Sequence, residues 1–328
     1  MEEILGDSSR LSLFKRGYKH GAFDREVDGP LHWAIQEEFL EAALYLIQEG
    51  EDPNRLDSNQ KSPLEVALEK KLFDVFKALV ENKADVNLVN NHSLLNSALV
   101  EAMKKDDLDV FKAVVDNIAD VNFVDDTNIS LLHKAVGLDK YEFVEMLINA
   151  GANVNCVDES NYTPLHFGAY HTVKTDIAKI LIKKGTEIDA KSIYLQSPLH
   201  LASSRGNQEV VKLLLENGAY HNIKDVDGNE PIHYASASGH SECLEILIQH
   251  GAHLNTRGEA SLTPLQIAIN ASRTVNARIL LSYGATLDSK DRFFPMERAM
   301  VKKNLDIFKL LLSFEPFTKR QICQSFAQ

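Results

Sequence analysis

Cysteine, tryptophan and long hydrophobic runs are all scarce in this sequence. Its 328 residues include 3 cysteines and 1 tryptophan, and the cysteines lie far apart with no CxxC pair. An odd number of scattered cysteines argues against a disulfide framework and against a zinc site, so a reducing compartment fits best. We expect a cytoplasmic protein, with entry into the nucleus left open.

Signals for membranes and for secretion are also missing. The richest apolar segment, Asp306–Phe314, is interrupted by Lys309 and Ser313, and it falls far short of the roughly 18 apolar residues of a spanning helix. The first residues, Met1–Asp7, carry acidic side chains where a signal peptide needs basic charge. We therefore expect neither a membrane span nor secretion.

Basic residues are fewer than acidic residues. The chain has 35 Lys and Arg against 47 Asp and Glu, a net charge of −12. Such a chain repels nucleic-acid phosphates and anionic membranes, so we expect neither as a partner. The charge is uneven, because residues 290–328 carry 8 basic and 4 acidic residues, a net +4 that leaves −16 on the remainder. A basic end fits an acidic partner, but a solvated cap gives the same pattern.

What the sequence does contain is a phrase that recurs about every 33 residues. The phrase is Thr/Ser-Pro-Leu-His, as at Thr163–His166 and Ser197–His200. A second marker follows in phase: a Gly about 19 residues after the Leu, and an Asn or Asp four residues later. Together they define about nine repeats, numbered 1 to 9, which start near residues 29, 62, 97, 130, 163, 197, 230, 263 and 294.

The letters of one repeat predict its structure. Thr or Ser is a preferred helix N-cap and Pro fits the first helical position, so a helix starts at each phrase. A second helix rich in Val, Leu and Ile follows, and the Gly suits the left-handed residue after its end. The Asp/Asn/Gly-rich stretch beyond is typical of a hairpin tip. Helices of about ten residues are marginal alone, so stability must come from stacking the pairs.

On these residues the sequence resembles the ankyrin repeat family. The family unit also begins near Thr-Pro-Leu-His and ends near Gly-Ala-Asp-x-Asn, which Gly151–Asn155 shows well. The resemblance covers roughly nine tenths of the chain. It implies an all-α fold, a curved solenoid of antiparallel helix pairs joined by β-hairpin-like loops.

The ends of the chain depart from the repeat. We divide the chain into an N-terminal capping or extension segment at 1–27, an ankyrin repeat domain at 28–315 and a C-terminal tail at 316–328. Leu11, Leu13 and Phe14 are candidates to cover the apolar face of repeat 1, and Trp33 is expected to pack where they meet it. Repeat 9 has a more polar first helix, with Arg298 and Lys302 among its charges, and is expected to act as the C-terminal cap.

Repeats 2 and 3 also depart from the pattern. Lys83 and Ile118 replace the Gly that ends the second helix. The stretch between Lys83 and Leu99 also contains two residues more than the corresponding stretch of most of the other repeats. A β-branched residue is strained at positive φ, so we expect the helix before Ile118 to end differently. We predict that residues 83–120 are the least protected part of the stack in hydrogen exchange.

Histidine and cysteine are the residues that invite a catalytic or metal-binding interpretation. Five histidines share one repeat position: His32, His133, His166, His200 and His233. In the family this His bonds neighbouring loop backbone, so we interpret these five as a structural ladder. Cys156 and Cys243 are expected to pack rather than react. No catalytic motif appears, and no segment of catalytic-domain size lies outside the repeats, so we expect no enzyme, cofactor or metal.

The resemblance implies that partners meet the concave side, formed by hairpin tips and exposed ends of the first helices. In the central repeats these positions hold Tyr162, Tyr170, His171, Ile193, Tyr194 and Arg205; in the first repeats they hold mainly Glu26, Gln36, Glu37, Lys61, Lys70, Lys104 and Lys105. Because Tyr and Arg dominate binding hot spots, we place the interface centre in the first set. The alternative is that these tyrosines pack against their own loops. The recurrent hairpin Asn is interpreted as a turn residue, with hydroxylation as the alternative.

We therefore predict a non-catalytic protein-interaction module, an adaptor or scaffold that is monomeric and binds a protein partner on a preformed surface. One alternative is the substrate-recognition subunit of a ubiquitin ligase, although residues 316–328 are too few for a complete ligase-binding box. Another alternative is the ankyrin portion of a larger protein.

Overall fold

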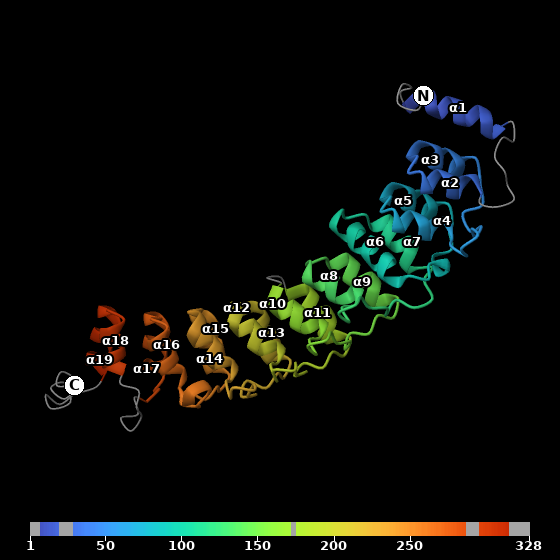
Figure 1. Ribbon diagram of the computed structural model, residues 1–328. Coiled ribbons are helices and arrows are strands. Elements are labelled where there is room, and N and C mark those ends of the chain that lie inside the picture. The colour runs from blue at the N-terminus through green and yellow to red at the C-terminus, as the bar shows by residue number, and fades with distance from the viewer. Residues whose placement is uncertain (1–6, 20–28, 172–174, 287–294, 315–328) are drawn as a thin grey trace. The chain divides into compact units, whose positions relative to one another are not determined.

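The computed structural model describes residues 7–19, 29–171, 175–286 and 295–314. Within these ranges the fold is all-α, as predicted: helix pairs are joined by loops, no β-strand is present, and one isolated antiparallel bridge joins Val124 and Ser130. The chain forms two compact units. Figure 1 labels their helices. The N-terminal unit comprises residues 1–135 and 140–153, and the C-terminal unit comprises 136–139 and 154–328.

The N-terminal unit contains helix α1 of the N-terminal segment and the helices of repeats 1 to 4. These are α1 (Asp7–Lys19), α2 (Pro30–Gln36), α3 (Leu40–Gln48), α4 (Pro63–Glu69), α5 (Phe73–Glu81), the 3₁₀ turn η1 (Val86–Leu88), α6 (His92–Lys104), α7 (Leu108–Val115), α8 (Leu131–Gly137), which crosses the division at 135, and α9 (Tyr141–Asn149). The first helices α2, α4 and α6 contact one another in order, and so do the second helices α3, α5, α7 and α9.

The C-terminal unit contains repeats 5 to 9. Its helices are α10 (Pro164–His171), α11 (Thr175–Lys183), α12 (Pro198–Arg205), α13 (Gln208–Glu216), α14 (Pro231–Ser238), α15 (Ser241–Gln249), the 3₁₀ turn η2 (Glu259–Ser261), α16 (Pro264–Asn270), α17 (Thr274–Ser282), α18 (Pro295–Val301) and α19 (Leu305–Phe314). Here too the first helices contact one another in order, as do the second helices.

The start of each first helix follows the predicted chemistry wherever the phrase contains proline. The first residue of a helix is Pro30, Pro63, Pro164, Pro198, Pro231, Pro264 or Pro295. Ser62 Oγ accepts the backbone N–H of Glu65 at 3.2 Å, and Thr263 Oγ1 accepts that of Gln266 at 3.3 Å. These hydroxyls satisfy amides that the first turn leaves without a helical partner.

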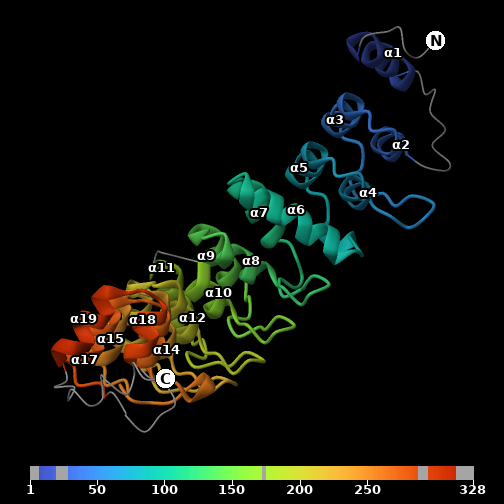
Figure 2. The same ribbon diagram turned by 60° about the vertical axis from the view of Figure 1, so that its left-hand side comes forward.

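The helix start predicted for repeat 3 is wrong. Helix α6 begins at His92 rather than at Ser97, and Figure 2 shows it longer than α2 and α4. Asn91 caps it by accepting the backbone N–H of Ser93 at 3.1 Å. Because Ala98 stands where other repeats have proline, nothing stops the helix from extending towards its N-terminus. Ser97 lies inside the helix, where its Oγ donates to Ser93 O at 2.9 Å.

The two replaced glycines behave differently. Lys83 adopts the left-handed conformation that glycine would take, with φ of 65°. Ile118 does not: α7 ends at Val115, and the backbone N–H of Ile118 donates to Val114 O at 3.0 Å. The expectation that the helix before Ile118 ends differently is therefore confirmed, because a β-branched side chain is strongly disfavoured at positive φ.

Helix α1 packs on repeat 1 through aromatic rings. The ring of Phe14 is buried and stacks on that of Trp33 with centroids 5.8 Å apart, which confirms the predicted place of Trp33. Phe39 meets Phe14 edge-on at 5.8 Å. Leu13 is 54% exposed, so the expectation that it covers repeat 1 is wrong for this residue. The C-terminal tail, 316–328, lies outside the described residues.

Candidate functional site

The repeated histidines tie each first helix to the following hairpin. The backbone N–H of Ser197 donates to His200 Nδ1 at 3.0 Å, and His200 Nε2–H donates to Asn229 O at 3.1 Å. In repeat 5, His166 bonds Thr163 N and Gln196 O at 3.0 Å each. A ring that accepts at Nδ1 and donates at Nε2 is neutral. These side chains therefore use both ring nitrogens within the fold.

Burial keeps these rings uncharged. It lowers the pKa of His166 to about 4, and it also lowers the pKa values of His200 and His233. In repeats 1 and 7 the same position contacts the next hairpin through His32 Nε2 to Lys61 O at 3.1 Å and His233 Nε2 to Thr256 O at 3.3 Å. His133 accepts from Ser130 N at 3.3 Å. Among the described residues, no His, Cys, Asp and Glu side chains gather in a group that could hold a metal.

A chain of hydrogen bonds that ends on a carboxylate links repeats 5, 6 and 7. Tyr162 Oη–H donates to Gln196 Oε1 at 3.3 Å, Gln196 Nε2 donates to Tyr234 Oη at 2.8 Å, and Tyr234 donates to Asp225 Oδ2 at 2.6 Å. Burial is the main cause that raises the pKa values of Tyr162 and Tyr234. Tyr162, predicted for the interface, thus bonds the next repeat through its hydroxyl rather than its own loop.

The hairpin tips of the same repeats are joined through backbone atoms. The N–H of Ile193 donates to Ser160 O, and that of Val226 donates to Tyr194 O, both at 3.0 Å. Asp225 Oδ1 closes its own hairpin by accepting the N–H groups of Asp227 and Asn229 at 3.0 and 2.8 Å. The tips are therefore fixed, while the side chains of Ile193 and Tyr194 stay exposed.

The other predicted residues form a cluster at the ends of α10 and α12. The guanidinium carbon of Arg205 lies 4.6 Å from the centroid of the Tyr170 ring, a cation–π contact. Tyr170 meets the ring of His171 edge-on at 4.8 Å. Burial, and then the charge of Arg205, lowers the pKa of His171. All three side chains are exposed.

The structure thus divides the predicted set into two exposed groups and one packed residue. The tip group is Ile193 and Tyr194, and the helix-end group is Tyr170, His171 and Arg205.

Two exposed tip residues escaped the sequence prediction. Leu195 and Val226 are exposed beside Ile193 and Tyr194. Leu195 occupies the turn position where repeats 5 and 7 have Asn161 and Gly228, and all three residues have positive φ. The sequence did contain a signal for Leu195, because a leucine stands at a turn position that favours Asn or Gly.

The predicted surface of the N-terminal unit consists mainly of paired charges. Lys61 Nζ lies 2.6 Å from Glu69 Oε1, and Lys70 Nζ lies 3.5 Å from Glu38 Oε1. Lys105 lies 4.4 Å from the centroid of the Phe73 ring. Gln36, Glu37 and Lys104 are exposed, and Glu26 lies outside the described residues.

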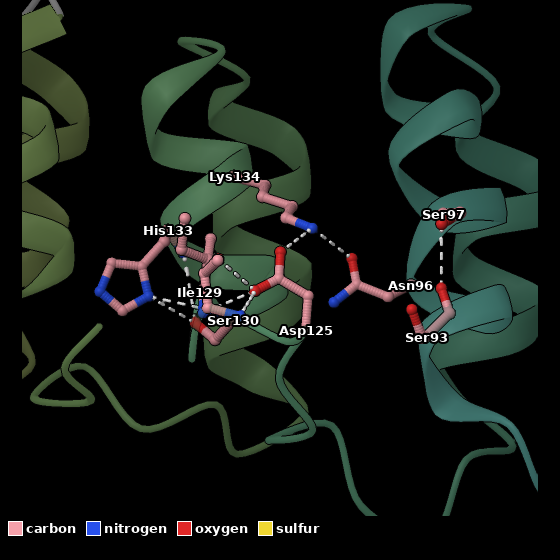
Figure 3. Close-up of polar contacts among 9 residues, drawn as sticks. Ser93, Asn96, Ser97, Asp125, Ile129, Ser130, His133 and Lys134 are labelled. Atoms are coloured by element: carbon pink, nitrogen blue, oxygen red, sulfur yellow. Dashed lines mark hydrogen bonds and ion pairs between the residues drawn. The ribbon is translucent and has the colours of Figure 1, made fainter. Parts of the chain in front are cut away.

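An ion pair also stands at the start of repeat 4 (Figure 3). Lys134 Nζ lies 2.7 Å from Asp125 Oδ2 and donates to Asn96 Oδ1 of repeat 3 at 2.9 Å. Burial alone would raise the pKa of Asp125, but Lys134 and hydrogen bonds from Thr127 and Ile129 lower it to about 2. Asp125 therefore stays charged and closes its hairpin.

The recurrent hairpin asparagines bond the following repeat. Asn54 Oδ1 accepts the N–H of Asp85 at 2.6 Å, and Asn155 Oδ1 accepts that of Glu187 at 2.8 Å. These side chains act between repeats, not only within the turn. Of the cysteines, Cys156 is half-buried, and burial raises the pKa of the Cys243 thiol to about 12, so this thiol is protonated and packs in the core.

Known proteins share this architecture. A family model described as ankyrin repeats, in three copies, matches residues 7–90, 99–192 and 193–258, which is most of the chain. The human transient receptor potential cation channel subfamily A member 1 is 31% identical over 101 residues, which are 30% of this chain and 8% of that channel. The chain thus matches only a small part of that relative. Among the described residues, no helix is long and apolar enough to cross a bilayer.

Proposed function

Because this chain belongs to the ankyrin repeat family, whose repeats are protein-interaction modules, we propose that it is a non-catalytic adaptor or scaffold. It binds a protein partner through the hairpin tips and first-helix ends of the C-terminal unit. The proposed interface centre consists of the tip group and the helix-end group. We also propose that the protein is monomeric and cytoplasmic, in keeping with its acidic charge and scattered cysteines.

One observation carries this proposal. The hairpin tips of repeats 5 to 7 are held by backbone bonds such as Val226 N–H to Tyr194 O, yet they present large apolar side chains to solvent. A surface that is already ordered loses little conformational entropy when a partner binds. Tyr170 and Arg205 add the two residue types that most often dominate interface energies. Rigidity and exposed anchors together favour binding over a purely structural role.

A partner-capture experiment tests the proposal. The full chain, tagged, is used to purify partners from cells, alongside the variant Tyr170→Ala/Tyr194→Ala/Arg205→Ala. A matched control replaces the same residue types elsewhere on the C-terminal unit: Tyr220→Ala/Tyr283→Ala/Arg278→Ala, all exposed. The dominant partner should be lost from the first variant and kept by the control, with equal melting temperatures. Equal capture by both variants would contradict the assignment.

One observation favours a second candidate, the ankyrin portion of a larger protein. The stretch shared with the human cation channel makes up 8% of that relative, so a similar stretch of repeats occurs there within a much longer chain. Recovery of a longer product of the same gene from cells would support this candidate. Recovery of cullin-type machinery in the capture experiment would instead support a ligase receptor.

A further inference from the structure

Leu195 is placed where stability alone does not favour it. It has φ of 56° and its side chain is 43% exposed, so it gains little from burial while adopting a conformation that bulky residues avoid. At the same turn position, the hairpins of repeats 4, 5 and 7 use Asn128, Asn161 and Gly228, which tolerate it. Gln60 of repeat 2 and Ser261 of repeat 8 also have positive φ there, so the turn itself requires this conformation. Leu195 is the large apolar side chain that adopts it.

Leu195 is the centre of an exposed apolar group. Ile193 and Tyr194 are each 50% exposed, and Val226 on the neighbouring tip is 54% exposed. The backbone bond from Val226 N–H to Tyr194 O holds the two tips together. The corresponding hairpins of the N-terminal unit are polar at the turn, with Ser58–Gln60 in repeat 2 and Asp126–Asn128 in repeat 4. The apolar tips are therefore a local feature of repeats 6 and 7.

Two lysines flank this group and have no ion-pair partner. Lys191 and Lys224 occupy the same position in consecutive hairpins, directly before Ser192 and Asp225, and both are exposed. Among the described residues, neither forms an ion pair, although Lys224 Nζ donates to the carbonyl of Arg257 at 3.5 Å. Six lysines of the N-terminal unit do form ion pairs: Lys61, Lys70, Lys77, Lys105, Lys134 and Lys140.

Three carboxylates lie close to these lysines in the sequence: Asp189, Asp225 and Asp227. Asp189, two residues before Lys191, accepts the backbone N–H of Tyr220 at 3.1 Å. The carboxylate of Asp225 is occupied by Tyr234 and by its own hairpin amides. Asp227 is exposed at the turn itself, three residues beyond Lys224. A bound segment would therefore meet positive charge beside the apolar group and a carboxylate at the turn.

We propose that the tips of repeats 6 and 7 dock an acidic peptide segment with an aromatic or aliphatic anchor. The residues concerned, called the tip patch, are Lys191, Ile193, Tyr194, Leu195, Lys224 and Val226. The anchor is buried against the apolar side chains, and carboxylates of the segment contact Lys191 and Lys224. This proposal rests on the proposed function and specifies its partner class. Because the whole chain is acidic, with a net charge of −12, recognition of an acidic segment depends on these two local cations.

A library of displayed random peptides, selected on the full-length protein, tests the charge preference. Peptides enriched on the unmodified protein should combine an aromatic or aliphatic residue with Asp or Glu. The variant Lys191→Glu/Lys224→Glu should enrich Lys and Arg instead. The control Lys179→Glu/Lys212→Glu makes the same change in net charge, at lysines that sit near acids on their own helices, and should keep the acidic preference.

The strained leucine gives a test that separates binding from folding. Leu195→Gly relieves the backbone conformation, so its melting temperature should be equal to or above that of the unmodified protein. Its affinity for a selected peptide should nevertheless fall by about tenfold or more, because an anchor contact is lost. Asn161→Gly changes the same turn position of repeat 5 and should leave that affinity unchanged.

Two results would overturn the tip-patch proposal: peptides selected equally well by Ile193→Ser/Tyr194→Ser/Leu195→Gly, or an acidic preference that survives reversal of both lysines. If the cellular partner still requires Tyr170 and Arg205 in either case, only the tip-patch proposal fails. If the cellular partner requires none of these residues, the proposed function fails as well.

Discussion

The two compact units differ in the ion pairs that connect neighbouring repeats. In the N-terminal unit, ion pairs connect neighbouring repeats: Lys70 to Glu38 at 3.5 Å, Lys77 to Asp107 at 2.7 Å and Lys140 to Asp106 at 2.5 Å. In the C-terminal unit, hydrogen bonds of the histidines do so, together with the chain from Tyr162 to the carboxylate of Asp225. Two ion pairs of that unit, Lys179 to Asp176 and Lys212 to Glu216, each lie within one helix.

This difference determines which side chains remain for a partner. Six lysines of the N-terminal unit are already paired with acids, so a partner that contacts them would have to replace those pairs. In the C-terminal unit, Lys191 and Lys224 stay exposed together with the apolar tips. The unit that uses little charge internally is therefore the one that presents charge and apolar surface outward.

The largest predicted effect is an unequal response to acid. The folded pKa of His166 is about 4 against an ordinary 6.5, so its contribution is complete above pH 6.5 and lost as the pH falls towards 4. That contribution is on the order of 3 kcal/mol. The lowered pKa of Asp125, about 2 against 3.8, acts only as the pH falls from 3.8 towards 2. As the pH falls, the C-terminal unit should therefore lose folding stability before the N-terminal unit does.

Urea unfolding at pH 7 and pH 5 measures this response. Fluorescence of Trp33 reports the N-terminal unit, while circular dichroism reports both units. Only the circular dichroism midpoint should fall markedly at pH 5. His166→Gln is the matched variant, because repeat 8 already has Gln266 there, accepting Thr263 N–H at 2.9 Å. If this variant keeps the full pH dependence, histidine protonation is not the cause.

Substitutions in the turn between the two helices of a repeat should change the free energy of unfolding in opposite directions in the two units. Gly206 has φ of 75°, and a Cβ there would lie 2.2 Å from the His240 ring, so Gly206→Ala should cost about 3 kcal/mol. Lys71 has φ of 58° at the same position of repeat 2, so Lys71→Gly should stabilise by up to about 1 kcal/mol. Chemical denaturation measures both changes, and equal signs would contradict the prediction.

Removing the cation of the Figure 3 ion pair should have a smaller effect. Lys134→Met leaves Asp125 without its ammonium partner and should destabilise the N-terminal unit by about 1 kcal/mol at pH 7, since both side chains are partly exposed. Near pH 2, where about half of Asp125 is protonated in the unmodified protein, the loss should be smaller. The same loss at both pH values would show that packing, not charge, is responsible.

A local effect is expected in residues 83–120. Hydrogen exchange there should be faster than in repeats 5 to 7, because α6 lacks the proline and the histidine of the phrase and α7 lacks a left-handed ending. Asn276→Ala in α17, a buried side chain bonded to Ala235 O at 2.9 Å, is a control that should alter exchange only in the C-terminal unit. Uniform protection across all repeats would contradict the prediction.

The sequence predicts what lies within one repeat better than what lies between repeats. Helix starts follow from local capping chemistry, so the proline-containing phrases located them correctly. The start of α6 was missed because Asn91 caps it from outside the phrase. The bond from Tyr162 to Gln196 joins residues 34 positions apart, and the contact of Arg205 with Tyr170 depends on how two helix ends meet. Such contacts are set by packing, which the repeat pattern does not encode.

A hydrogen-exchange footprint of the captured partner on the full-length protein tests the central claim most directly. We predict that the partner slows exchange at the tips and first-helix ends of repeats 5 to 7, around Tyr170, Tyr194 and Arg205, and leaves the N-terminal unit unchanged. A footprint confined to the N-terminal unit, or to the second helices of either unit, would contradict the account.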